Sequence, residues 1–164
     1  MTKRSIHSKF MASSLASALA VPVLAGTLAF AAPVVAEAAD QATCRIHAIE
    51  AKEEGDGKIP EELSFMADEL QAPAFRIYKG FKLLEKQDFK LEIGKRESSK
   101  FKSGHNLELE LLGKRDGKLE LHTTLMRSDA KLVDMDFGVH SNQIVLMPIT
   151  RGEGAVIFAY QCKS

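Results

Sequence analysis

The sequence predicts a mainly β fold: an antiparallel sandwich or partly open barrel of about eight strands, with one short helix near the start of the mature chain. Apolar and polar residues alternate along several short segments, which is typical of antiparallel strands with one buried face. Only one segment has helical spacing. The two cysteines, Cys44 and Cys162, enclose nearly all of the chain that follows an apolar N-terminal segment.

The N-terminal segment has the features of an export signal. Three basic residues precede an uncharged run from Phe10 to Ala36, and Ala36-Glu37-Ala38 matches the small-residue pattern that signal peptidase recognises. The run is long enough to span a bilayer, so a retained anchor is the alternative. Two prolines and a glycine interrupt the run, and no cationic segment follows it, which favours cleavage. We therefore expect a cleaved signal peptide over residues 1–38 and an exported mature chain, periplasmic or extracellular.

The charge and cysteine content of the mature chain indicate one small exported domain. The whole sequence has 22 basic and 22 acidic residues. Residues 1–38 hold three of the basic residues and one of the acidic ones, so the mature chain has a formal charge of −2. In an exported chain, two cysteines near the ends most simply form a disulfide, here Cys44–Cys162. This bond would close a single β-rich domain over residues 39–164.

The first part of the mature chain predicts a strand, a loop and the helix. Residues 43–52 read as a first strand, and Gly55-Asp56-Gly57 has the composition of a loop. Pro60 then opens a helix, because proline is tolerated at the first helical position, and Pro73 ends it. The apolar stripe of this helix consists of Leu63, Met66 and Leu70.

The rest of the chain predicts strands. Alternation with one wet face is found in residues 89–93, 107–111, 119–125 and 133–137. Residues 144–149 and 155–160 are apolar on both faces, which predicts two central strands joined by a turn.

The alternation also predicts how two neighbouring strands align. A two-residue turn at Asp116-Gly117 would place Leu111 opposite His122, so that an apolar face would meet a polar one. A three-residue loop, Arg115-Asp116-Gly117, with the glycine in the left-handed conformation, avoids this mismatch. The longer loop places Glu110 opposite His122.

A row of three polar side chains follows from these alignments. A similar loop over residues 128–130 would place Asp136 beside His122, which predicts the row Glu110–His122–Asp136 on an exposed sheet face. Carboxylates that flank an imidazole are reasonable ligands for a divalent cation. The alternative is a solvated face with cross-strand ion pairs, each worth about 0.2–1 kcal/mol. We expect no other cofactor.

A basic segment follows an acidic one. Residues 53–70 contain seven acids and one base, whereas residues 76–102 contain nine bases and four acids. The second segment could dock an anionic polymer, an envelope surface or an acidic protein. Alternatively, the two segments complement each other within the domain. The nine basic residues are Arg76, Lys79, Lys82, Lys86, Lys90, Lys95, Arg96, Lys100 and Lys102.

Several functions lack their sequence signals. There is no G-x-S-x-G, H-E-x-x-H or phosphate-cradling glycine motif, although a carboxylate-only active site would need none. The aromatic residues near the basic segment are better used as core than for base stacking, so we expect no nucleic-acid binding. His105 lies between Gly104 and Asn106, and we expect it to be exposed in a turn.

The stretch Pro73–Leu84, which ends in two leucines, is followed by Gly94-Lys95 and by Gly104–Leu109. These segments resemble an uncharacterised family of small, exported, β-rich bacterial proteins. In that family a Leu-Pro-Asn-Gly-like turn precedes the next strand, whereas this chain has Ser103-Gly104-His105-Asn106. The resemblance implies export and a β fold, and it implies no activity and no functional residue.

These observations favour a non-catalytic interaction module of the cell envelope or the extracellular space. It would bind a protein or an anionic polymer through a sheet face or the basic segment. A secreted inhibitor is one version, since a disulfide-closed domain is a rigid platform that lowers the entropic cost of binding. The alternative is a metal-dependent or carboxylate-based hydrolase that uses Glu110, His122 and Asp136. We expect no membrane span after signal cleavage.

Overall fold

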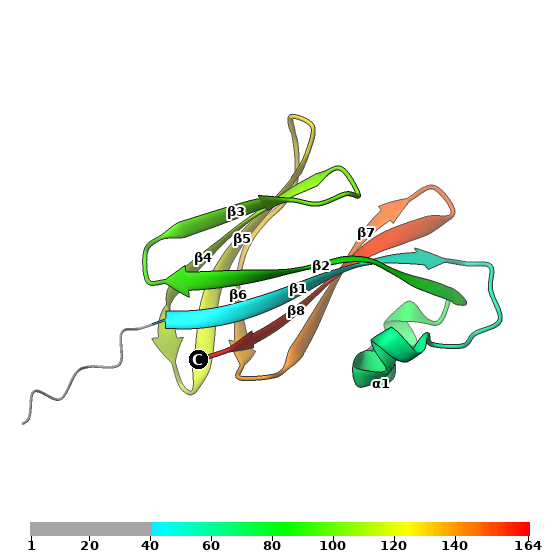
Figure 1. Ribbon diagram of the computed structural model, residues 1–164, viewed down its shortest axis with the longest axis horizontal. Helices are drawn as coiled ribbons and strands as arrows, with labels where there is room; N and C mark the ends of the chain where they lie inside the picture. Colours follow the sequence, from blue (N-terminus) through cyan, green and yellow to red (C-terminus); the bar gives the residue numbers. More distant parts are fainter. Residues whose placement is uncertain (1–40) are drawn as a thin grey trace, which may run out of the picture. The chain divides into compact units, whose positions relative to one another are not determined.

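The computed structural model describes residues 41–164, and the predicted signal peptide, residues 1–38, lies outside them. Two four-stranded antiparallel sheets make up most of the described chain, and neither closes into a barrel (Figure 1). The first sheet contains, in order, β2 (Gly80–Glu92), β1 (Gln41–Lys52), β8 (Gly154–Lys163) and β7 (Ile144–Arg151). The second sheet contains β3 (Arg96–Lys100), β4 (His105–Arg115), β5 (Lys118–Arg127) and β6 (Ala130–His140). The mainly β prediction is confirmed, and the arrangement is consistent with a sandwich.

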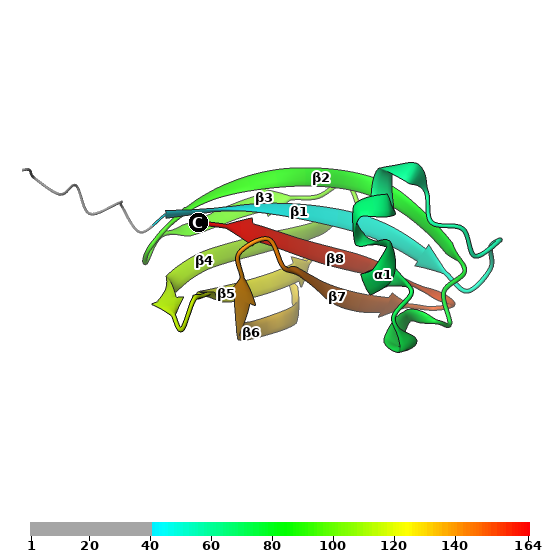
Figure 2. The same ribbon diagram turned by 90° about the horizontal axis from the view of Figure 1, so that it is seen from below.

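The two sheets face each other across an apolar core (Figure 2). In β4, the alternating residues Leu107, Leu109 and Leu111 are fully buried in this core. From the first sheet, Phe158 and Tyr160 of β8 pack against them and are equally buried. The face that the alternation marked as apolar is therefore the face that is buried.

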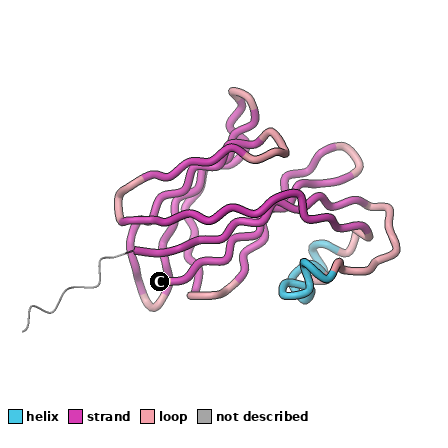
Figure 3. The backbone as a smooth tube through the Cα atoms, in the orientation of Figure 1, coloured by secondary structure: helices cyan, strands magenta, loops and turns pink. Residues whose placement is uncertain are grey.

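A second apolar core lies on the outer side of the first sheet, beneath the segment that joins β1 to β2. The helices of this segment are cyan in Figure 3. This segment forms a 3₁₀ helix (Glu61–Met66), α1 (Ala67–Leu70) and a second 3₁₀ helix (Pro73–Phe75). The predicted stripe is buried and consists of Leu63, Met66 and Leu70. Most of the predicted helix is thus 3₁₀, and Pro73 opens the next 3₁₀ helix instead of ending the first one. Within residues 41–164, no helix has the length and apolar character to cross a membrane.

One of the two strands predicted to be central lies at an edge. β8 is central, but β7 has only β8 as a neighbour. Both faces of β7 are apolar because residues 145, 147 and 149 pack against the inter-sheet core, whereas Ile144 and Leu146 pack against the second core. Pro148 in β7 is the sequence signal for an edge, since proline has no backbone N–H to donate to a neighbouring strand.

Strand β3 was not predicted. Residues 96–100 carry almost no apolar side chains, so they show no alternation. Ile93, which continued the alternation of residues 89–93, lies beyond the end of β2 and is 43% exposed. Pairing with β4 makes β3 a strand, and this pairing is a long-range interaction that local sequence does not report.

The disulfide Cys44–Cys162 is formed, as predicted. The two cysteines are direct cross-strand partners in β1 and β8, and both are fully buried in the inter-sheet core. The bond therefore joins the first and last strands of the described chain at the centre of the first sheet.

The β4–β5 hairpin has the predicted alignment but a different turn. Glu110 lies opposite His122, yet the turn contains two residues, Asp116 and Gly117, both with positive φ. Positive φ at both positions is the conformation that tight hairpins favour. The alignment is restored by a one-residue bulge at Leu112, not by the three-residue loop that we expected.

The β5–β6 hairpin uses the same combination. Its turn consists of Ser128 and Asp129 instead of the predicted residues 128–130, and the bulged residue is Leu132. Asp136 again lies opposite His122, as predicted.

Candidate functional site

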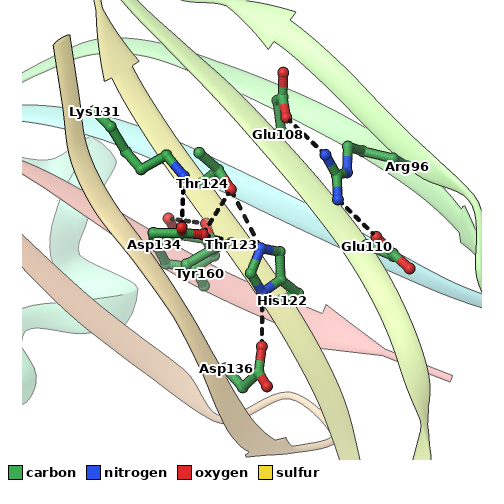
Figure 4. Close-up of polar contacts among 10 residues, drawn as sticks. All are labelled: Arg96, Glu108, Glu110, His122, Thr123, Thr124, Lys131, Asp134, Asp136 and Tyr160. Atoms are coloured by element: carbon green, nitrogen blue, oxygen red, sulfur yellow. Dashed lines mark hydrogen bonds and ion pairs between the residues drawn. The ribbon is translucent and has the colours of Figure 1, made fainter.

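The predicted row of acidic residues and histidine lies on the outer face of the second sheet (Figure 4). The Nδ1 atom of His122 lies 2.6 Å from Oδ1 of Asp136 on the neighbouring strand. Its Nε2 atom lies 3.1 Å from Oδ1 of Asp134, one row away. A doubly protonated imidazole can donate to both carboxylates, whereas a neutral ring can donate to only one. Each ring nitrogen of His122 thus has one carboxylate as its neighbour.

Glu110, the third member of the row, pairs with Arg96 from β3. The guanidinium Nη2 lies 3.3 Å from Oε2 of Glu110, and Nη1 lies 3.4 Å from Oε2 of Glu108. One arginine thus bridges the carboxylates of two neighbouring rows (Figure 4). Sequence reasoning missed this contact because it did not predict β3.

Asp134 is held from two further sides. Its Oδ2 atom lies 2.6 Å from Nζ of Lys131, and the Thr124 hydroxyl donates to its Oδ1 at 3.2 Å. The Lys131 ammonium, helped by the Thr124 hydroxyl, holds the pKa of Asp134 below its ordinary value.

Apart from Lys131–Asp134, which lies within β6, the network consists of cross-strand pairs on a largely solvated face. Glu110 faces Arg96, and both aspartates face His122. Within residues 41–164, no group of three or more histidine, cysteine or acidic side chains is placed to hold a metal ion. Pairs this exposed each contribute little to the stability of the fold.

The basic segment is divided between the two sheets, because β2 belongs to the first sheet and β3 to the second. Lys95 pairs with Glu92, and Arg96 pairs with two glutamates. No ion pair in the described chain joins residues 53–70 to residues 76–102. The other basic residues occupy the β1–β2 connection (Arg76, Lys79), β2 (Lys82, Lys86, Lys90), the end of β3 (Lys100) and the β3–β4 turn (Lys102).

Two of these residues contribute to a cationic face on the outer side of the first sheet. Residues 42, 44 and 46 of β1 point into the inter-sheet core, so residues 43, 45 and 47 point outward. The helical segment packs over the other half of this side, around residues 49–51 and 155–157, and leaves this half open. The cationic face consists of Arg45, Lys86, Lys90 and Lys163. Arg45 and Lys163 were not predicted, because they come from strands distant in sequence from the basic segment.

One carboxylate, Asp88, lies among these cations, and Arg45 binds it with two hydrogen bonds. The Arg45 Nε–Asp88 Oδ1 distance is 2.7 Å, and the Nη2–Oδ2 distance is 3.1 Å. Hydrogen bonding to Arg45 lowers the pKa of Asp88. Lys86, Lys90 and Lys163 form no ion pair with any residue from 41 to 164.

His47 lies at the border between the cationic face and the helical segment. It is opposite Lys86 in the β1–β2 pairing, and its ring lies 5.0 Å from that of Phe65, centroid to centroid. The side chain is 4% exposed, and its Nδ1 atom has no hydrogen-bond partner in the described chain. Burial, followed by the charges of Arg45 and Lys86, lowers the pKa of His47. We therefore expect a neutral imidazole near pH 7.

Two surface hollows meet on the cationic face. Pairing across three strands places Thr43 between Lys90 and Lys163, and these three residues line both hollows. The smaller hollow, about 260 Å³, is further lined by Arg45, Asp88, Asn142, Gln161 and Cys162. The larger, about 720 Å³, extends toward the ends of β1 and β8.

Another hollow of about 740 Å³ lies at the other end of the first sheet, around the β7–β8 turn. Its lining has mixed charge: four glutamates, one lysine and one arginine. Lys52 already pairs with Glu50 there, at 3.4 Å. This hollow contains no residue of the acidic row or the cationic face.

The expectation that His105 is exposed is wrong. His105 is fully buried at the start of β4, and its ring packs edge-on against Phe158 with centroids 5.3 Å apart. Its Nδ1 atom lies 2.9 Å from the Ser103 hydroxyl, whereas Nε2 has no partner in the described chain. Burial lowers the pKa of His105. The turn composition of the sequence around it hid this burial.

We compared the chain with known proteins by sequence and by structure. The sequence matches no protein-family model and no curated protein. The structure matches no solved structure. The case for a function therefore depends on the charges, contacts and hollows described above.

Proposed function

We propose that the mature chain is an exported, non-catalytic interaction module that binds an anionic partner through the cationic face. The observation that supports this proposal is a group of three lysines, Lys86, Lys90 and Lys163, that form no ion pair with residues 41–164 and lie beside the partly satisfied Arg45. The formal charge of the mature chain is slightly negative, so this face is a local exception. A local excess of positive charge attracts anions and speeds their association.

The first sheet also gives these cations a rigid support. β1 and β8 are central strands, the disulfide joins them, and an apolar core packs against each side of the sheet. A preorganised surface loses little conformational entropy when it binds. The proposal includes export by means of the predicted signal peptide, because disulfides persist in oxidising compartments.

The test compares two triple variants that remove equal charge. K86Q/K90Q/K163Q removes the lysines of the cationic face. The matched control, K79Q/K82Q/K100Q, removes three lysines of the basic segment that lie elsewhere. Binding of oxidised residues 39–164 to immobilised polyglutamate and polyphosphate is measured at low and high salt.

We expect the cationic-face variant to lose at least about tenfold in affinity at low salt, and the control to lose less than about threefold. High salt should abolish the difference, because exposed charges are screened. Equal losses in both variants, or no retention of the wild type on either polymer, would refute the proposal. Capture from an envelope extract with the same two variants then identifies the natural partner.

A further inference from the structure

The row Lys90–Thr43–Lys163 has a shape that suits a single small anion. Cross-strand pairing places the short Thr43 between two long lysines on a flat sheet face. Adjacent strands lie about 4.8 Å apart, so the two lysine backbones are about 10 Å apart and both ammonium groups can reach the space above Thr43. Without an anion the two ammonium groups repel each other when they converge. An anion above Thr43 attracts both ammonium groups, so that their convergence becomes favourable.

Polar groups surround the smaller hollow that this row borders. Thr43 and Gln161 make no side-chain hydrogen bond to another residue in the range 41–164, so their donors are available. Asp88 is the one carboxylate in the lining, and the two hydrogen bonds from Arg45 neutralise it. Within the smaller hollow an incoming anion therefore meets hydroxyl, amide and ammonium donors, whereas the carboxylates of Glu92 and of the C-terminal Ser164 line the larger hollow.

We propose that this hollow binds one phosphoryl group of the anionic partner. The inference rests on the proposed function and names the chemical group that the face recognises. The donors come from three strands, so they approach from different directions, which suits the three oxygens of a phosphoryl group better than the two coplanar oxygens of a carboxylate. The volume of about 260 Å³ accommodates a phosphoryl group and its ester carbon, and it is below the usual range for larger organic ligands.

The disulfide supports this geometry directly. Thr43 and Lys163 are cross-strand partners, and they immediately adjoin the bonded pair Cys44–Cys162. The covalent bond therefore holds the alignment of β1 and β8 at the position where their side chains form the hollow.

The test measures thermal stabilisation and calorimetric binding of oxidised residues 39–164 by inorganic phosphate, with acetate and chloride at equal ionic strength. We expect phosphate to raise the melting temperature and the other two anions to leave it nearly unchanged, because a ligand that binds the folded state stabilises it. Thr43→Val keeps the shape and the charge but removes the hydroxyl, and it should weaken phosphate binding about tenfold. Lys100→Gln is the control, since Lys100 lies at the end of β3 in the second sheet, outside the cationic face and the hollow, and it should change phosphate binding less than about twofold.

Two further arms identify the source of the phosphoryl group. Glycerol 3-phosphate represents a soluble phosphomonoester, and vesicles that contain phosphatidylglycerol represent a lipid headgroup. Competition by inorganic phosphate in either arm supports the site.

Two results would overturn the inference: equal stabilisation by phosphate and acetate, or wild-type phosphate affinity in Thr43→Val. If polyglutamate and polyphosphate still bind through the cationic face in that case, the proposed function stands without the phosphoryl site. If the wild type binds neither polymer nor phosphate, both proposals fail.

Discussion

Leu112 in β4 and Leu132 in β6 are both single-residue bulges, one on each side of β5. Both side chains are exposed, 44% and 41%, whereas the other three leucines of β4 are fully buried. The bulge at Leu112 precedes the two-residue turn of its hairpin, and the bulge at Leu132 follows the turn of the other hairpin. Each bulge shifts the pairing of the two strands by one residue. These two insertions bring Glu110 and Asp136 into line with His122.

Deletion of Leu112 should leave the protein folded. The deletion removes the residue that has no partner, while Leu111 stays opposite Leu121 and Gly113 opposite Glu120. We expect the free energy of unfolding to change by about 1 kcal/mol or less, since an exposed side chain is lost. Urea denaturation measures the change.

Deletion of Glu108 is the matched control. Either Leu107 moves from the core face to the solvent face, or the bulge closes and Glu110 moves to a core position, because a one-residue shift reverses every side chain of the shifted segment. We expect this variant to be unfolded or strongly destabilised. Equal stability of the two deletions would show that the bulge at Leu112 does not carry the alignment.

Replacement of both Cys44 and Cys162 by alanine should destabilise the domain. The disulfide spans 118 residues, and the chain-entropy model assigns such a bond about 4–5 kcal/mol. We expect a lower urea midpoint with a little-changed fold, because ten pairs still join β1 and β8. The same loss should follow reduction of the wild-type protein by dithiothreitol, whereas the reductant should not affect the double-alanine variant. An unchanged midpoint would mean that the reduced, unfolded chain is already compact.

Acid should destabilise the protein from about pH 6.5 downward. Burial lowers the pKa of His47 and of His105 in the folded state, whereas the unfolded value is about 6.5. Below pH 6.5 the unfolded state therefore binds more protons than the folded state, and the free energy of unfolding falls as the pH falls. Above pH 6.5 these two groups contribute no pH dependence. Urea denaturation between pH 7.5 and pH 4.5 measures the slope.

His105→Leu should make this slope shallower, because it removes one group that the folded state keeps neutral. Gln71→Asn is the control: Gln71 is exposed and carries no titratable group, so the slope should not change. Titration of the imidazole signals of the folded wild type by NMR checks the same prediction without a variant. An ordinary pKa for His105 in that titration would contradict it.

Divalent cations should not stabilise the acidic row. Glu110 is bound by Arg96, and the two nitrogens of His122 point to different carboxylates, so these side chains do not converge on one point. We expect Mg²⁺, Ca²⁺ and Zn²⁺ to leave the melting temperature unchanged in the wild type and in H122N/D136N. A cation-dependent rise in the wild type that the double variant lacks would show that the row can rearrange into a metal site, as the hydrolase alternative requires.

Local patterns in the sequence predict much of this structure. The alternation in β4 and β5 marks the residues that are buried, and the requirement that apolar faces meet is enough to align Glu110 with His122 although the turn was wrong. The spacing of Leu63, Met66 and Leu70 predicts their burial in the same way, although most of the segment is 3₁₀. The pairing of the two cysteines follows from their number. These features depend on nearby residues or on a simple match of faces, so one sequence is sufficient to predict them.

The positions of strands within each sheet depend on the tertiary structure. Residues 144–149 are apolar on both faces because two separate cores cover β7, and not because β7 is central. Arg45 and Lys163 join Lys90 on one face only because β1 lies between β2 and β8. His105 is buried because Phe158 of the opposite sheet packs against it. In each case the deciding contact joins residues far apart in the chain, and periodicity reports which side of a strand is apolar but not which strand lies beside it.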